Sequence, residues 1–344
     1  MISKLIFIIN LFYSGILLPQ TVIKSNDDLQ IHVSNFTETI IQISEYYYYN
    51  SQLNDADKIL KPAIEITEQT GGKKYSAELL IQKAKINSIN SFITNNSYEQ
   101  SINDLNTAIN YCKETNSTKL LGDAYNYLGF ALYAQKYNQN LGTYEEALKY
   151  LNEAEQIRDE YKDLRGLAET YIYKGIVLER LGNNNEALEL YSKANEICEN
   201  NNFKLEQSYA TRHIAFIKSY NKDFESALEL FRKSLNLREE IGYKVYLPFS
   251  YLSVGNMYFE LNRKNEAEEF YVKALTSALQ NGAERVVVLC RMSLGDLYLS
   301  KNLYEKSLEE FTIALNISEK INFQRGINYS KEKINSLKKI QNQK

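Results

Sequence analysis

The sequence predicts an all-α protein, built as a solenoid of antiparallel helix pairs that ends in a capping helix. Gly and Pro are scarce, at 14 and 3 of 344 residues, whereas the good helix formers Leu, Ala, Glu and Lys are abundant. A pattern of small and aromatic residues recurs about every 40 residues over most of the chain. Each copy contains two helical segments whose apolar faces must stack on a neighbouring copy, which is how a solenoid forms.

The first 25 residues are expected to be a signal peptide or membrane anchor. Lys4 precedes an apolar run over residues 5–18, and Pro19 follows it. These 14 residues are too few for a spanning helix, which needs about 20, and a basic start with a short apolar core is typical of a secretory signal. No A-x-A cleavage site is present, so a membrane tether through residues 5–18 and a buried helix stay open. We therefore expect an exported chain (periplasmic, secreted or membrane-tethered), with a linker over residues 26–35.

Seven copies of the repeat are predicted over residues 36–322. The first helix of each copy has a slot for a small residue, and these slots fall at 44, 84, 129, 175, 215, 255 and 295. The second helix has two small residues around a large one, as in Ala187, Tyr191 and Ala194. Copies two and three contain five and six extra residues, which we place between their two helices.

The motifs LGDLY (294–298), VGNMY (254–258) and AEEFYVKA (267–274) resemble the tetratricopeptide repeat (TPR). The spacing of 40 residues, longer than usual, resembles that of Pins-like adaptors and of bacterial TPR sensor modules. The resemblance implies a right-handed superhelix. Pro62 falls inside the second helix of copy one and is expected to bend or interrupt it. Residues 323–344 are expected to form a capping helix and tail.

Four consecutive tyrosines, Tyr46 to Tyr49, lie in the first helix of copy one. At 100° per residue they point to all sides of that helix. We expect Tyr47 to enter the core and Tyr48 to face the groove, with Tyr46 and Tyr49 directed toward the place of a preceding repeat. Edge packing in an end repeat explains this run, and self-association through the N-terminal repeat is the alternative.

A stripe on the first helices predicts a partner-binding groove, because in the family it resembles this stripe lines the concave surface where extended peptides lie. Apolar anchors with interleaved polar side chains suit an extended peptide, whose backbone needs hydrogen bonds. The alternative is that a long second helix or the tail covers the stripe. The candidate residues are Asn126, Phe130, Tyr133, Ile172, Ile176, Arg212, Phe216, Leu252, Asn256 and Phe259.

Composition and motifs argue against other function classes. The 40 basic and 43 acidic residues are interspersed, so nucleic acid is not an expected partner. The three cysteines are far apart and form no CxxC, so no metal site, disulfide framework or cofactor is expected. No GxSxG, HExxH or GxGxxG motif occurs. We expect a non-enzymatic scaffold for a protein or peptide. The alternative is a sensory or regulatory module whose output domain is on another chain.

Overall fold

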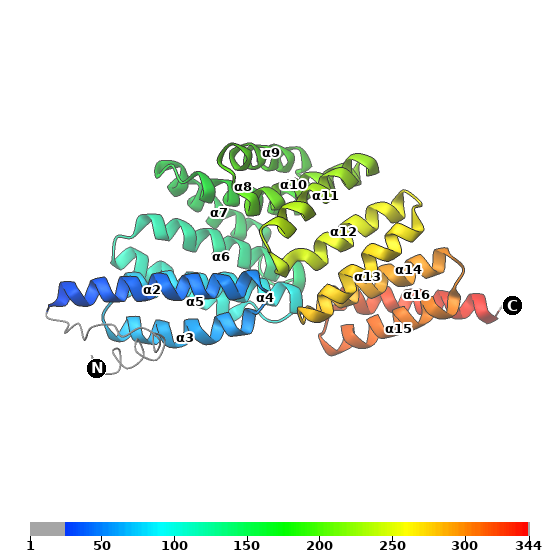
Figure 1. The fold of residues 1–344 in the computed structure, drawn as a ribbon, viewed down its shortest axis with the longest axis horizontal. Helices are drawn as coiled ribbons and strands as arrows, with labels where there is room; N and C mark the ends of the chain where they lie inside the picture. Colours follow the sequence, from blue (N-terminus) through cyan, green and yellow to red (C-terminus); the bar gives the residue numbers. More distant parts are fainter. Residues whose placement is uncertain (1–24, 343–344) are drawn as a thin grey trace.

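A computed structural model describes residues 25–342, and within them the chain forms fifteen α-helices, one short 3-10 helix and no strand (Figure 1). The segment expected to be a signal peptide or anchor lies outside the described residues except for Ser25. Within the described part, no helix is long and apolar enough to cross a membrane. The helices are α2 (Asn26–Tyr49), α3 (Leu53–Gln69), α4 (Lys73–Thr94), α5 (Glu99–Glu114), α6 (Thr118–Gln139), α7 (Tyr144–Glu160), α8 (Leu164–Arg180), α9 (Asn184–Asn201), α10 (Lys204–Tyr220), α11 (Phe224–Glu240), η1 (Lys244–Tyr246), α12 (Leu247–Glu260), α13 (Lys264–Gln280), α14 (Glu284–Ser300), α15 (Tyr304–Lys320) and α16 (Gln324–Asn342).

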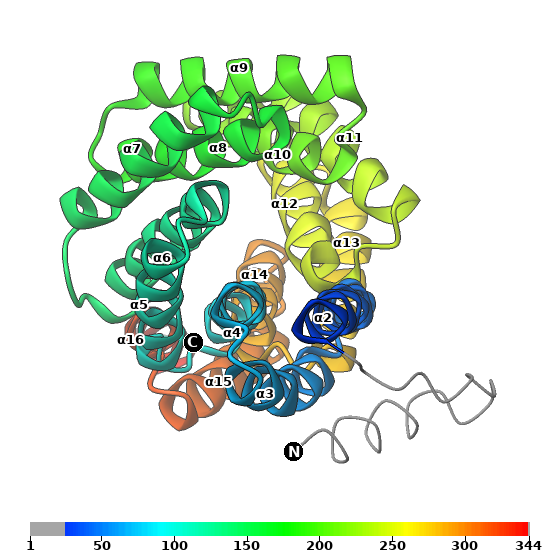
Figure 2. The same ribbon diagram turned by 90° about the vertical axis from the view of Figure 1, so that its left-hand side faces the viewer.

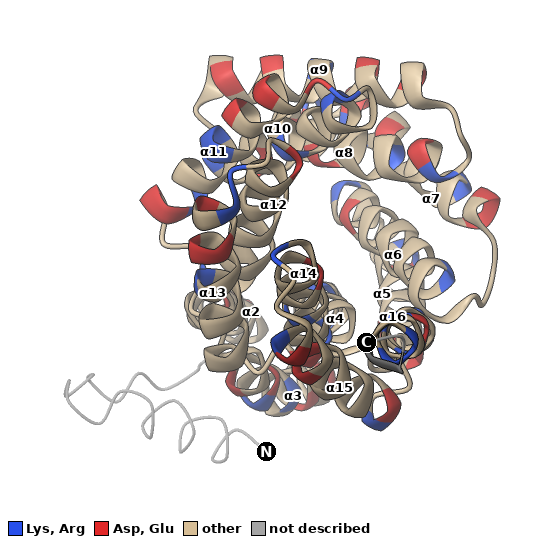
Figure 3. Ribbon diagram, turned by 90° about the vertical axis from the view of Figure 1, so that its right-hand side faces the viewer, with Lys and Arg blue, Asp and Glu red and all other residues tan. Residues whose placement is uncertain are grey.

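The helices pack in seven consecutive pairs, from α2 and α3 to α14 and α15, and α16 covers the last pair. Viewed end-on, the first helices α6, α8, α10 and α12 line the inside of a curved array, and their partners α7, α9, α11 and α13 lie outside (Figure 2). Figure 3 shows acidic and basic residues mixed along the outer helices. The predicted all-α solenoid with a C-terminal capping helix is confirmed.

Close approach within the pairs depends on the small-residue slots. A Cβ atom added at Gly175 would lie 2.5 Å from the Tyr191 ring, and one at Gly255 would lie 2.7 Å from the Tyr271 ring. In these pairs the large residue of the second helix therefore packs directly against the backbone of the first helix.

Every turn between successive helices contains a residue with positive φ. Asn and Gly occupy most of these positions, because Gly has no Cβ and the short side chain of Asn tolerates the left-handed conformation. The residues are Ser51, Gly71, Asn95, Asn116, Asn140, Gly142, Lys162, Gly182, Asn202, Lys222, Gly242, Asn262, Gly282, Asn302 and Asn322.

Two local expectations in the first repeat are wrong. Residues 26–35, expected to form a linker, are the beginning of α2, whose first turn is capped by Ser25 Oγ accepting from the Asp28 amide at 3.1 Å. Pro62 does not interrupt α3, which is continuous over Leu53–Gln69. The side of the helix that holds Pro62 faces solvent, so the ring displaces no core side chain.

The extra residues of copies two and three lengthen the first helices instead of forming long connections between helices. Helices α4 and α6 have 22 residues each, whereas α8, α10 and α14 have 17. The additional turns bring the C-terminal ends of α4 and α6 to the last repeats of the array.

The two ends of the solenoid meet there. Arg285 Nη1 of α14 donates to the Phe92 carbonyl of α4 at 2.7 Å, and Asn95 Nδ2 donates to the Ile321 carbonyl at 3.1 Å. The Tyr48 and Tyr243 hydroxyls hydrogen-bond at 2.5 Å. The curved array is thus closed into a ring by contacts of the second pair, through α4, with the last pair, and of α2 with the segment around η1 (Figure 2).

Tyr48 and Tyr49 both take part in this closure. Tyr48 is buried on the inner side, as expected, and the Tyr49 ring lies 5.2 Å from the Tyr243 ring. Tyr49 therefore does not face an empty edge, because Tyr243, the residue before η1, supplies its neighbour from a distant repeat. Tyr46 remains exposed, so self-association through this repeat stays a prediction.

Candidate ligand-binding cavities inside the ring

Two cavities lie on the inner side of the ring. The first, which we name the polar cavity, has a volume of about 1020 Å³ and is lined by residues of α2, α4, α6, α7, α8 and α10 and of turns between helices. The second, which we name the aromatic cavity, has a volume of about 470 Å³ and is lined by α4, α6, α8, α10, η1, α12, α14 and α16. Tyr173 and Tyr209 line both cavities. Both volumes are close to the range of about 300–1000 Å³ that is usual for ligand pockets.

The structure brings most of the predicted groove residues together around the aromatic cavity. Ile172 instead lines the polar cavity, and Asn126 and Phe259 line neither. The Asn126 amide is buried and donates to Glu169 at 3.0 Å while accepting from Thr170 at 3.0 Å, so its role is structural. Those at the aromatic cavity are Phe130, Tyr133, Ile176, Arg212, Phe216, Leu252 and Asn256.

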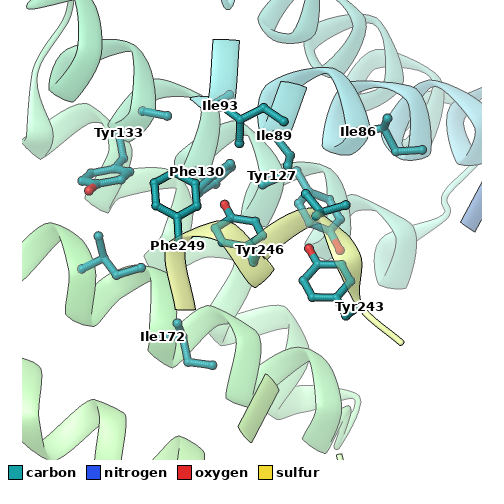
Figure 4. Close-up of a cluster of buried hydrophobic side chains, with 14 of the residues drawn as sticks. Ile86, Ile89, Ile93, Tyr127, Phe130, Tyr133, Ile172, Tyr243, Tyr246 and Phe249 are labelled. Carbon is teal, nitrogen blue, oxygen red and sulfur yellow. The ribbon is translucent and has the colours of Figure 1, made fainter. Parts of the chain in front are cut away.

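The apolar part of this stripe also packs internally. Phe130 and Tyr133 are each 6% exposed, and Figure 4 shows Phe130 close to Phe249 and Tyr246 of the opposite side. The neighbouring side chains come mainly from α4, η1 and α12, with α16 contributing at one side. The stripe is therefore partly core and partly cavity wall. The long second helix that was considered as a cover is not what lies against it.

Four arginines line the aromatic cavity: Arg180, Arg212, Arg285 and Arg325. Three of them contact Tyr137, which lies at the end of the lengthened α6. Its ring centre lies 4.8 Å from Arg180 Cζ and 5.7 Å from Arg285 Cζ, and its hydroxyl accepts from Arg325 Nη1 at 3.4 Å. Guanidinium groups stacked on aromatic rings keep their N–H edges available for other acceptors.

Arg212 and Arg285 lack carboxylate partners among the described residues. Arg212 lies 4.4 Å above the Phe216 ring and makes no hydrogen bond within the described chain. Arg285 is only 4% exposed, and its Nε has no partner. Burial, together with the nearby charge of Arg238, lowers the pKa of Arg212 to about 10, and burial also lowers the pKa of Arg285.

The polar cavity differs because its buried cation is paired. Arg158, 3% exposed, donates to Asp123 at 2.8 Å, to Glu169 at 3.4 Å and to Thr170 at 2.9 Å. Burial raises the pKa of Asp123, so this carboxylate depends on Arg158 for its charge.

Sequence reasoning missed several residues of the aromatic cavity. Phe92 and Tyr137 lie in the extra residues of copies two and three, and Phe249 and Arg285 lie one or more turns before the stripe that was considered. The available signal was the concentration of aromatic residues within the inserted segments, which a turn exposed to solvent would not require.

These helix pairs define a class of α-solenoid, and the comparisons identify the family. The family model "Tetratricopeptide repeat" matches residues 136–200 and 206–280. This match shows that the chain contains tetratricopeptide repeats, and the seven helix pairs extend the same architecture over the rest of the described residues. No curated protein matches the sequence.

Several solved structures are similar in fold. A Rap protein complexed with competence and sporulation factor is 12% identical with a TM-score of 0.52, covering 89% of this chain and 98% of that chain. Aspartyl phosphate phosphatase F from Bacillus subtilis is 14% identical with a TM-score of 0.51, covering 93% and 96%. A signal transduction ATPase with a tetratricopeptide repeat sensor, from Pyrococcus horikoshii, is 16% identical with a TM-score of 0.58, covering 94% of this chain and 51% of that chain.

Proposed function

We propose that the protein is a non-enzymatic scaffold that binds an extended segment of a protein or peptide along the inner side of the ring. The observation that carries this proposal is the gathering of seven predicted groove residues around one cavity, which adjoins a second cavity through Tyr173 and Tyr209. The fold similarity to a Rap protein complexed with competence and sporulation factor adds support.

The cavity wall has the chemistry that such a segment needs. Asn256 lines the aromatic cavity, is half-buried and makes no hydrogen bond within the described chain. Its amide can both donate to and accept from a peptide backbone. Phe216 and Leu252 provide apolar surface on either side of it. Anchors of this kind typically contribute most of the binding free energy of an interface.

The test compares two asparagines. Partners captured by the tagged chain are identified by mass spectrometry, and their affinity is then measured for the Asn256→Ala and Asn265→Ala variants. Asn265 is exposed on α13 and lies outside both cavities, so its variant serves as the matched control. We expect Asn256→Ala to weaken binding by about 1–2 kcal/mol with an unchanged melting temperature. Equal affinities for the two variants would show that the partner does not bind on the inner side of the ring.

A second candidate is a sensory or regulatory module whose output domain is on another chain. It is favoured by one observation, namely that the aromatic cavity is lined by both ends of the ring, from Phe92 of α4 to Arg325 of α16. A ligand there would contact both sides of the junction between α4 and α14, and could shift the equilibrium toward the closed ring. If hydrogen exchange at the contact between α4 and α14 is the same with and without a bound partner, this candidate fails.

We also propose that the chain is exported. The proposal rests on Lys4, the apolar run over residues 5–18 and Pro19. Expression in a secreting host followed by intact-mass measurement is expected to show loss of about 20–25 residues. Full-length protein recovered from the cytosol would count against export and would leave the binding proposal untouched.

A further inference from the structure

We propose that the aromatic cavity binds an organic oxyanion, a carboxylate or a phosphate group attached to an aromatic or apolar body, which is recognised by Arg212 and Arg285. This inference rests on the proposed function and specifies the chemistry of the group that occupies this site. It follows from the charges that surround the cavity, the geometry of the two guanidinium groups, and the size of the space.

Positive side chains outnumber negative ones around the cavity, and the nearby carboxylates are already engaged. Glu179, which is not part of the lining and whose side chain is 4% exposed, lies 3.6 Å from Arg180 Nη2 and 3.7 Å from His213 Nδ1. Of the acidic residues, only Asp296 joins the four arginines in the lining, and it is already bound by Lys333 at 2.7 Å and by the Tyr329 hydroxyl. A buried charge without a partner is costly, and a protein normally pairs it. Arg158 shows that this chain does pair a buried arginine elsewhere, with Asp123 and Glu169.

A further cation behind the wall strengthens the positive potential. Arg238 is fully buried, and it lies 4.7 Å from the Tyr209 ring and 5.3 Å from the Tyr246 ring, both of which line the aromatic cavity. It donates to the hydroxyls of Ser208 and Ser250, and no described carboxylate pairs with it. In a site of low dielectric, such an excess of positive charge favours an anion strongly.

The two guanidinium groups are held on neighbouring rings. Arg285 Cζ lies 4.5 Å from the Phe92 ring, Arg212 Cζ lies 5.9 Å from the Phe249 ring, and the Phe92 and Phe249 ring centres are 6.0 Å apart. Planar N–H forks of this kind match the oxygen geometry of carboxylates and phosphates.

The space admits a small organic ligand. At about 470 Å³ the cavity is larger than a bare inorganic ion requires. Its wall includes Phe130, Phe216 and Tyr246, which offer aromatic surface to an apolar body. The four arginines disfavour a cationic ligand, and an uncharged ligand would leave the guanidinium charges unmatched.

The experiment uses the full chain and four probes of similar shape: benzoate, phenyl phosphate, benzyl alcohol and benzylamine. Isothermal titration calorimetry and melting temperature are the readouts. We expect saturable binding and a raised melting temperature with one or both anionic probes only. Benzoate and phenyl phosphate distinguish a carboxylate from a phosphate source, and preference for either supports the proposal. Equal binding of benzyl alcohol, or binding of neither anion, would overturn it.

Two variants locate the site. Arg212→Gln keeps two amide hydrogen-bonding groups but removes the unpaired charge, so we expect it to fold with a melting temperature at least equal to that of the unmodified protein. Its affinity for the anionic probe is expected to fall about tenfold or more. Arg263→Gln is the control, because Arg263 is exposed and paired with Glu266 at 2.9 Å. Unchanged affinity in Arg212→Gln would reject Arg212 as a ligand-binding residue and the proposal with it.

The failures of the two proposals are distinguishable. If no anion binds but Asn256→Ala still weakens capture of the partner, the scaffold function stands and the oxyanion inference is rejected. If anions bind and Asn256→Ala captures the partner normally, the aromatic cavity is an oxyanion site and the partner binds elsewhere.

Discussion

Arg158 and Arg212 are both arginines of the inner half of this molecule, and their surroundings give them opposite effects on stability. Arg158 is held by two carboxylates, a threonine and a backbone carbonyl, whereas Arg212 lies on aromatic rings without any hydrogen bond in the described chain. The first is part of the folded framework. The second carries an unbalanced charge into a cavity, which is the arrangement expected of a binding group.

We expect Arg158→Ala to reduce the free energy of unfolding by about 3–5 kcal/mol, because it leaves the carboxylates of Asp123 and Glu169 without their buried partner. Thermal unfolding followed by circular dichroism checks this. Arg263→Ala, which breaks an exposed ion pair with Glu266, is expected to change the stability little, because solvent screens this pair. Similar losses in the two variants would mean that the buried network contributes little.

His213 is expected to make stability sensitive to acid. Burial lowers its pKa, although Glu179 lies 3.7 Å from its Nδ1, and Arg212 and Arg180 oppose a further positive charge. The unfolded chain binds a proton near pH 6.5, whereas the folded chain binds it only at lower pH. Stability is therefore lost as the pH falls below about 6.5. Melting temperatures between pH 7.5 and 5.5 should fall more steeply for the unmodified protein than for His213→Gln. Parallel curves would show that His213 does not titrate in this window.

At this scale the sequence located a good part of the candidate site. Phe130, Tyr133, Ile176, Arg212, Phe216, Leu252 and Asn256 follow from one helical stripe, since equivalent positions in a solenoid face the same side. Arg285 and Phe92 could not be found in this way. They enter the cavity because the ring closes, and that closure depends on distances between repeats that no helical wheel contains.

At the level of the helix pair, the contact between the small slot and the large residue determines how closely the two helices approach. We expect Gly175→Ala to destabilise the protein by about 1–3 kcal/mol, even though Ala is the better helix former, because its Cβ would meet the Tyr191 ring. Chemical denaturation is the measurement.

Gly242→Asn is a suitable control for that substitution. Gly242 has a φ of 67° with open space around it, and the equivalent turns between successive pairs already hold Asn202 and Asn322 at φ values of 57° and 54°. The control is expected to be nearly neutral. A loss equal to that of Gly175→Ala would indicate that general loss of glycine, and not the contact with Tyr191, is responsible.

The repeat period predicted the number and pairing of the helices but not their lengths. A period counts residues between equivalent slots, so five or six additional residues look the same whether they form a loop or extend a helix. Phe92 and Ile93 continue the apolar face of α4 beyond its usual end, and Tyr137 does so in α6. Burial of these side chains inside the ring stabilises the longer helices relative to a loop.

For the whole molecule, closure of the ring predicts communication between distant repeats. We expect Phe92→Ala to increase hydrogen exchange in α14 and α16, since Phe92 lies beneath Arg285 and its carbonyl accepts from the same side chain. Phe259→Ala, a half-buried position outside both cavities, should affect only α12 and its neighbours. Exchange confined to α4 in the Phe92→Ala variant would show that the two ends are not coupled.

The meeting of Asn95 with Ile321, 226 residues apart in the chain, also bears on how the protein assembles. An open array of repeats has only short-range contacts, so its folding can begin in any pair and spread along the chain. Here the last contacts to form must bring together segments of the second and the last pairs, and the entropy of that loop opposes them until the intervening pairs are rigid. Refolding is accordingly expected to be biphasic in stopped-flow experiments. Circular dichroism should report helix formation in the fast phase, and the fluorescence of Tyr48 and Tyr243 should change in the slow phase.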